Sequence, residues 1–295
     1  MSTFNDVAFV WAPGEGPLIL PPNVGALLGS QGFKAFNVQI HYNNPSLDTG
    51  VLDSSGVEFF YTTQKREFDL GVLQLGDPFL GLLGVKVGNG FSQHTFDCSG
   101  DCSSVSLSEN VTVLREYLHM HMTGSAMYNA QIRDGKIIHK GSVEFYDFSQ
   151  SGMFSVIQEP FDIRPGDSFQ TSCFYSAGAN TTFGLGSADE MCIAYLFYYP
   201  RQVVPGSNGF PYTCAFGLGG FFPQCEEVLT SRSLESTSQF NRSFGESTNA
   251  ICDTSAFASP SIAPTTGKKS TSGARCKLAD MMFLAATIVG IAVAF

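Results

Sequence analysis

Short runs of β-branched and aromatic residues recur along the chain, and each run is bounded by glycine, proline, asparagine, aspartate or serine. Outside the apolar C-terminal segment, none of these runs keeps the 3.6-residue period of an amphipathic helix, so the pattern predicts strands. The runs lie at residues 36–42, 57–62, 70–75, 111–122, 126–132, 154–161, 168–174 and 191–199. Many short strands at regular spacing predict an all-β fold, specifically a jelly-roll-like β-sandwich.

The charge balance excludes one class of function. The chain has 16 lysine and arginine residues against 26 aspartate and glutamate residues, which gives a formal net charge of −10 at pH 7. A protein that binds nucleic acid by neutralising phosphates needs a basic face. Nucleic acid is therefore not an expected partner.

Cysteines and glycosylation sequons both indicate the secretory pathway. The eight cysteines are widely and irregularly spaced, and none forms a C-x-x-C pair, which favours disulfides over zinc or thioredoxin-like chemistry. Asn110, Asn180 and Asn241 each begin an N-x-S/T sequon and are glycosylation candidates. Disulfides persist in oxidising compartments, so we expect a cell-surface or extracellular protein.

The two ends of the chain lead to further expectations. The N-terminus has no signal-peptide pattern, so either export is unconventional or the true N-terminus is missing. Residues 281–295 carry no charge, but this run is shorter than the ~20 residues of a spanning helix. Small residues at 270–274, a polar spacer and an apolar end favour a GPI-attachment signal, with a tail-anchored helix as the alternative. Either would attach the protein to a membrane through residues 278–295.

A change of composition marks the end of the folded part. Serine, threonine, asparagine and glycine dominate residues 231–272, where few large apolar side chains occur. Such a stretch cannot bury enough apolar surface to fold. We therefore place the domain end between about residues 205 and 225 and predict a Ser/Thr-rich stalk over residues 215–277.

The strand predicted at residues 111–122 contains an H-x-H pair. Alternation along the strand places Val111, Val113, Arg115, Tyr117, His119 and His121 on one face, with Leu114, Leu118, Met120 and Met122 on the other. Two imidazoles on one sheet face can hold copper or zinc. The alternative is two partly buried histidines that hydrogen-bond to backbone carbonyls.

A methionine on another predicted strand could complete such a site. Met191 follows a glycine-rich loop, and its thioether is a soft ligand that suits Cu(I). A methionine in this position is otherwise core filler, so Met191 is informative only together with the histidines.

Of the other histidines, His94 and His139 are expected to have surface or loop roles. Asp134 and Asp167 lie in turn motifs and are expected to bond to backbone, Asp134 within an Asp-Gly hairpin.

These motifs, taken in order, resemble the copper type II, ascorbate-dependent monooxygenases. The resemblance to the C-terminal domain of that family rests on residues 117–124, 133–135, 164–167, 171–173, 189–192 and 198–201, and upstream residues 11–12, 20–22, 24–25, 38–45 and 54–57 are similar to the end of its N-terminal domain. It covers roughly residues 8–214. The motifs are closer to the dopamine β-hydroxylase-like branch than to the peptide-amidating branch, which has an arginine where this chain has Tyr117.

The resemblance implies a division of the chain and two copper sites. Residues 1–62 would be the remnant of an N-terminal copper domain, and residues 63–214 the C-terminal copper domain. One copper would be held by His119, His121 and Met191, where O2 is activated and the substrate is hydroxylated. The other site would take His41 as its last ligand. Its first two ligands form a His-His pair that the sequence does not contain, so we read the chain as truncated at the N-terminus.

The resemblance also implies disulfides that support the site. Cys173 and Cys192 flank the loop before Met191, so a bond between them would fix that ligand. Cys98 and Cys102 are expected to pair with two downstream cysteines. Cys214 is the strongest partner for one of them, and the pairing of Cys225 and Cys252 stays open.

The function implied is hydroxylation of a C–H bond in a small, aromatic amine-like substrate with O2, copper and ascorbate. The alternative is a copper-binding surface protein that is catalytically inactive because it lacks the electron-transfer site. A purely structural adhesion module is a third possibility, which the soft-ligand set disfavours. Because hydroxylation takes two electrons and one Cu(I) supplies one, we expect no enzymatic turnover from these 295 residues alone.

Overall fold

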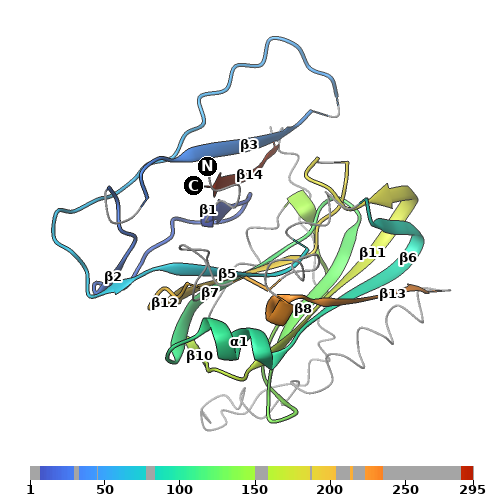
Figure 1. The fold of residues 1–295 in the computed structure, drawn as a ribbon. Helices are drawn as coiled ribbons and strands as arrows, with labels where there is room; N and C mark the ends of the chain where they lie inside the picture. The colour runs from blue at the N-terminus through green and yellow to red at the C-terminus, as the bar shows by residue number, and fades with distance from the viewer. Residues whose placement is uncertain are drawn as a thin grey trace, which may run out of the picture.

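The structure, a computed structural model, describes most of the chain up to residue 234 and a short stretch near the C-terminus. The described residues are 7–29, 33–44, 46–77, 84–149, 159–186, 188–203, 213–214, 223–234 and 287–294. Strands make up nearly all of the regular structure in these residues, and helix α1 (Gly100–Ser106) is short. Figure 1 shows the arrangement of the strands.

Two antiparallel sheets form the body of the molecule. One has the order β10-β7-β12-β5, with β10 Phe161–Ile163, β7 Val111–His119, β12 Ile193–Tyr199 and β5 Gly71–Gly76. The other has the order β13-β6-β11-β8-β9, with β13 Val228–Leu234, β6 Lys86–Cys98, β11 Ser168–Thr182, β8 Gly124–Arg133 and β9 Lys136–Val143. The predicted all-β sandwich is confirmed.

The main hydrophobic core lies between these two sheets. Leu73 and Leu75 of β5 are fully buried in it, together with Phe96 of β6 and Phe169 of β11. Burial of a side chain of this size is worth roughly 1.5–3 kcal/mol, so the alternation of apolar residues decides which face of each strand turns inward.

The predicted face assignment along residues 111–122 is wrong at one point. Phe197 of β12 pairs with Arg115, but Tyr198 pairs with Val113, so a β-bulge falls at Leu114. Val111 and Val113 therefore lie in the main core, whereas Tyr117 belongs to a second cluster on the outer face of the same sheet. A bulge inserts one extra residue, which exchanges the two faces of the strand beyond it.

The second cluster joins an N-terminal segment to the four-stranded sheet. Val10 of β1 (Val7–Trp11) and Val24 of β2 (Val24–Gly25) are buried against Tyr117, Tyr195 and Phe197. Glu15 of the same segment forms an ion pair with Arg115, whose guanidinium lies 4.8 Å from the Phe197 ring centroid. The outer face of the sheet is therefore covered by residues from the first 25 positions.

The remaining strands belong to two small sheets. β3 (Asn37–Asn43) confirms the strand predicted at 36–42, and it pairs with β14 (Thr287–Ala294), which also pairs with β1. β2 pairs in parallel with β4 (Phe68–Asp69).

In the part of the chain that the structure describes, no helix is long and apolar enough to cross a bilayer. The membrane anchor expected at residues 278–295 stays a prediction without structural support.

Two strand predictions differ from the structure, and one lies outside the described residues. Residues 57–62 form no strand, and residues 58–62 are exposed, with Phe60 at 87%, so this run lacks the half-buried face that favours a strand. Conversely, β13 pairs with β6 along its whole length, and Leu234 at its end is buried. This part of the expected stalk is therefore folded. Most of the run predicted at 154–161 is not described.

Three disulfides connect the described segments. Cys173 is bonded to Cys192, the pair expected from the sequence, and Cys98 is bonded to Cys214. Cys102 of α1 is bonded to Cys225, in a 3-10 turn at Pro223–Cys225. The last two bonds hold residues 213–214 and 223–234 onto the sandwich across more than 110 residues of sequence. Cys252 and Cys276 lie outside the described residues.

Candidate metal centre

The two histidines of the H-x-H pair meet at the end of β7. His119 is the last residue of the strand, and its ring centroid lies 5.1 Å from that of His121, with an angle of 79° between the ring planes. His121 is 2% exposed, whereas His119 is half-buried and stacks on Tyr117. The strand end thus places two imidazoles side by side.

Met120, between the two histidines, points into the main core. Its side chain is fully buried there. The Tyr146 hydroxyl accepts a hydrogen bond from the Met120 N–H at 3.0 Å and donates one to the Met120 carbonyl at 2.6 Å. Because neighbouring residues of an extended chain point to opposite sides, fixing Met120 inward directs His119 toward the outer face.

The loop before Met191 fixes the orientation of the His121 ring. His121 Nδ1 lies 3.0 Å from the Asp189 carbonyl oxygen. A carbonyl oxygen can only accept, so Nδ1 carries the hydrogen, and the lone pair of the neutral ring is on Nε2. Metal-binding histidines are typically oriented in this way, by a hydrogen bond from the other ring nitrogen to a backbone carbonyl or a carboxylate.

Glu190, from the same loop, holds the turn that follows β7. Its buried carboxylate accepts the His121 N–H at 2.9 Å and the Thr123 N–H at 2.5 Å. Burial raises the pKa of Glu190 above its ordinary value, and the two backbone hydrogen bonds oppose that rise. Asp189 and Glu190 together attach the loop to His121 and to the turn that follows β7.

Met191 comes directly after Glu190 and is anchored through its backbone. Its carbonyl accepts a hydrogen bond from the Tyr175 hydroxyl at 2.8 Å, and its half-buried side chain packs against the second cluster, which includes Tyr117. The Cys173–Cys192 disulfide ties the next residue to β11. The structure therefore brings the loop that carries Met191 into direct contact with His121.

His41 does not share this sheet. It lies on β3, where it pairs with Val289 of β14 in the three-stranded sheet. His119, by contrast, ends a strand of the four-stranded sheet. The side chain of His41 is outside the description, so its predicted role as a ligand stays a prediction.

The histidines expected at the surface have buried or half-buried structural roles instead. His94 of β6 is 2% exposed. Its Nε2 donates to the Val87 carbonyl at 2.9 Å, and its Nδ1 accepts from the Ser231 hydroxyl at 2.8 Å. Burial lowers its pKa. The expectation of a surface or loop position was wrong because the polar groups of β6 and β13 satisfy the ring in the interior.

His139 of β9 pairs with a buried carboxylate. Its Nε2 lies 3.1 Å from Oε2 of Glu116, and the other carboxylate oxygen, Oε1, accepts the Asn129 side-chain amide N–H at 2.8 Å. The His139 ring stacks on Phe161 at 3.6 Å between centroids. This network links β7, β8 and β9 and explains why a glutamate can lie inside the sandwich.

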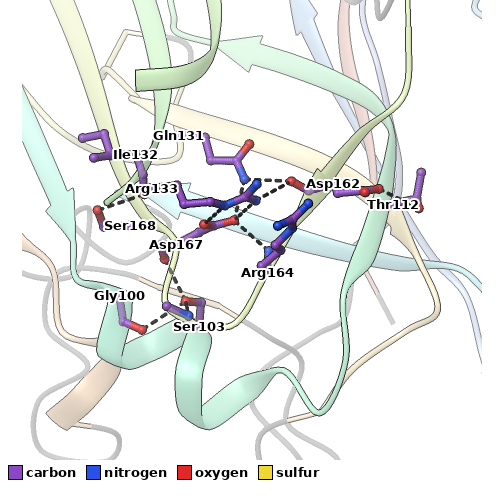
Figure 2. A network of polar contacts seen from close by, with 11 residues as sticks. Gly100, Ser103, Thr112, Gln131, Ile132, Arg133, Asp162, Arg164, Asp167 and Ser168 are labelled. Carbon is purple, nitrogen blue, oxygen red and sulfur yellow. Dashed lines mark hydrogen bonds and ion pairs between the residues drawn. The ribbon is translucent and has the colours of Figure 1, made fainter. Parts of the chain in front are cut away.

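Asp167 is likewise structural, as the turn motif predicts, but more highly connected than expected. Figure 2 shows its carboxylate facing Arg133, Gln131 and the backbone of Arg164. It accepts from Arg133 Nε and Nη2 at 2.7 Å each, from Gln131 Nε2 at 2.6 Å and from the Arg164 N–H at 2.7 Å. Burial opposes ionisation, yet these donors hold the pKa of Asp167 below its ordinary value.

The hairpin between β8 and β9 is confirmed. Asp134 and Gly135 connect the two strands and both have positive φ, 51° and 71°, as a tight hairpin turn requires.

Three cysteine sulfurs among the described residues also lie close enough together to hold a metal ion. Cys98, Cys102 and Cys214 lie close together and are buried. All three are in disulfides, so none offers a thiolate. This cluster therefore does not compete with the histidine pair as a metal site.

Comparisons with known proteins agree with this arrangement. Residues 68–206 match the family model described as the copper type II ascorbate-dependent monooxygenase, C-terminal domain. The chain is 32% identical over 202 residues to a tyramine beta-hydroxylase from Caenorhabditis briggsae, covering 67% of this chain and 34% of that protein. It is 29% identical over 203 residues to bovine dopamine beta-hydroxylase, covering 66% and 33%.

A third relative has a similar identity and covers a similar share of the chain. The chain is 30% identical over 211 residues to DBH-like monooxygenase protein 1 from Gallus gallus, covering 68% of this chain and 34% of that protein. The matched part spans about a third of the length of these relatives. The match includes the H-x-H strand, the Met191 loop and the Cys173–Cys192 disulfide. The chain therefore belongs, through residues 68–206, to the copper type II ascorbate-dependent monooxygenase family as a C-terminal domain.

Proposed function

We propose that His119, His121 and Met191 bind one copper ion. The observation that carries this proposal is the contact between the Met191 loop and His121, in which Asp189 sets the tautomer and Glu190 holds the backbone. Two imidazoles and a thioether suit Cu(I), whereas a thioether is a poor ligand for zinc. When bound, copper supplies the one-electron redox chemistry by which such a site uses O2.

The activity we propose is hydroxylation of a C–H bond in a small aromatic amine. The support comes from the family and from relatives named for dopamine and tyramine. In the overall reaction, one atom of O2 enters the substrate as a hydroxyl group and the other leaves as water. Ascorbate supplies the two electrons, and two protons are taken up.

The protein's own residues would orient the ligands of the site. The Asp189 carbonyl retains the proton on His121 Nδ1, and Tyr117, fully buried, stacks on His119. The nearest cation along β7, Arg115, is paired with Glu15. This environment favours an amine with an aromatic ring over a peptide carboxylate.

Product analysis would test the substrate class. The protein, with any upstream sequence that its transcript encodes, is loaded with copper and given ascorbate, labelled O2 and either tyramine or an N-acylglycine. Tyramine that has gained one labelled hydroxyl group with the wild-type protein, but not with His121→Ala, would support the proposal. Hydroxylation of the N-acylglycine alone would contradict it.

The proposed location is the secretory pathway or the cell exterior. Three disulfides fit an oxidising compartment, and the side chains of Asn110 and Asn180 are exposed, as glycan attachment requires. Asn241 lies outside the described residues. A loss of mass after enzymatic removal of N-glycans from secreted protein would support glycosylation, and an unchanged mass would contradict it.

A further inference from the structure

Asp77, the residue after β5, makes two hydrogen bonds to the residue that follows Met191. Its backbone N–H donates to the Cys192 carbonyl at 3.0 Å, and its side-chain Oδ1 accepts the Cys192 N–H at 2.9 Å. The β5–β12 ladder ends one position earlier, where Gly76 lies opposite Ile193. The Asp77 side chain thus supplies the acceptor for the N–H beyond the end of the ladder.

This N–H has no access to solvent. Cys192 is fully buried and Asp77 is 4% exposed. Gly76, with φ of 105°, permits the close approach of the two chains, because a Cβ there would overlap the Cys192 carbonyl oxygen. A buried N–H without an acceptor is costly, so the carboxyl of Asp77 is needed where it lies.

The same short segment is held at each neighbouring position. Glu190 accepts the N–H groups of His121 and Thr123, and the Tyr175 hydroxyl donates to the Met191 carbonyl. Asp77 fixes both backbone polar groups of Cys192. Met191 therefore lies between two residues whose positions are set by hydrogen bonds to distant parts of the chain, the turn after β7 and the residue after β5.

We infer that Asp77 is a positioning residue for Met191, acting through the backbone of Cys192 to keep the thioether beside His119 and His121. This inference rests on the proposed copper site and adds to it a residue with no predicted role. Loss of a hydrogen-bond partner of a metal-binding side chain typically lowers metal affinity by about 10-fold to 100-fold, and Asp77, which acts one residue away from Met191, is expected at the lower end.

Asparagine is the matched replacement at this position. Burial raises the pKa of Asp77 well above its usual range, and the nearby carboxylate of Glu190 adds to the effect. A neutral amide of the same shape keeps the Oδ1 acceptor, whereas alanine removes it. Serine is too short to reach the Cys192 N–H and gives a second variant if alanine does not fold.

The experiment measures sulfur ligation of Cu(I) in the 295-residue protein by X-ray absorption. We expect the sulfur scatterer to be lost or weakened in Asp77→Ala or Asp77→Ser, with Cu(I) affinity lowered about 10-fold, and retained in Asp77→Asn. In a Met191→Ala background, Asp77→Ala should lower Cu(I) affinity no further. Asp167→Ala is the control, because it also removes a buried acceptor of a backbone N–H, that of Arg164.

The outcomes separate this inference from the copper site itself. An unchanged sulfur signal and unchanged affinity in folded Asp77→Ala or Asp77→Ser would overturn the role of Asp77 while leaving the site intact. An equal loss in Asp167→Ala would also overturn it, because the effect would then be general destabilisation. A wild-type protein without a sulfur scatterer would overturn both proposals.

Discussion

The Asp189 carbonyl oxygen lies 3.0 Å from Nδ1 of His121, although the two positions have a sequence separation of 68. Through this one contact, the loop that carries Met191 also sets the tautomer of a proposed histidine ligand. The orientation of the imidazole and the position of Met191 are therefore expected to change together when the loop is disturbed.

Glu190 should contribute strongly to stability because it satisfies two backbone N–H groups at once. Glu190→Ala removes this acceptor from the N–H of buried His121 and from the N–H of half-buried Thr123, and we expect a loss of about 2–4 kcal/mol in the free energy of unfolding. Glu190→Gln keeps one acceptor oxygen and should lose less. Urea denaturation of the three proteins measures the difference, and equal stability of all three would contradict this role.

The Cys173–Cys192 disulfide should stabilise the fold through the unfolded state. It closes a loop with a sequence separation of 19, for which chain entropy gives roughly 3 kcal/mol. The double variant Cys173→Ala/Cys192→Ala should lower the free energy of unfolding by about that amount. Peptide mapping without reduction identifies the bond directly. Two free thiols in secreted protein would show that the bond does not form.

His94 should make the protein less stable at mildly acidic pH. Its pKa is lowered in the folded state, so the unfolded chain binds the proton more readily. Stability is therefore unaffected above the unfolded pKa of about 6.5 and falls as the pH drops below it, by at most about 1.4 kcal/mol per pH unit. Comparison of urea midpoints at pH 7.5 and 5.5 tests this. His94→Gln, whose side chain does not titrate, should show a smaller difference between the two urea midpoints. A difference equal to that of the wild type would show that His94 does not cause the pH dependence.

Asp167 should contribute to stability at neutral pH and lose that contribution in acid. Its folded pKa is lowered, so the stabilisation is present above the unfolded pKa of about 3.9 and is lost as the pH falls through the folded value. Asp167→Ala should lower the free energy of unfolding by about 2–4 kcal/mol at pH 7, because Arg133, Gln131 and the Arg164 N–H lose their acceptor. Thermal unfolding at pH 7 measures the loss, and a variant as stable as wild type would contradict it.

The sequence predicts the strands of the sandwich and the H-x-H pair because both depend on local patterns. Alternation and turn residues identify β8, β11 and β12, and the Asp-Gly turn identifies the β8–β9 hairpin. The bulge at Leu114 escapes prediction because it is set by pairing with β12, not by the residues of β7 alone. It changes the face of Val111 and Val113 without separating His119 from His121.

Other features depend on contacts between distant segments. β13 is a short, partly polar strand that pairs with β6 and is held by the Cys102–Cys225 disulfide, so composition alone suggested a stalk. Asp77 and Tyr146 have no motif that marks them, because each acts through both backbone polar groups of one residue that lies more than 20 positions away in the chain. Glu190 stands beside Met191 in a motif, but its role appears only once the turn at His121 and Thr123 is placed.

The most direct test of this account is the ligand set of Cu(I) in the 295-residue protein. We expect about one copper per molecule and a sulfur scatterer in its X-ray absorption spectrum that disappears in Met191→Ala. His119→Ala and His121→Ala should each weaken binding, whereas His94→Gln should leave it unchanged. A sulfur signal that persists in Met191→Ala, or full copper binding without His119 and His121, would contradict the proposed site.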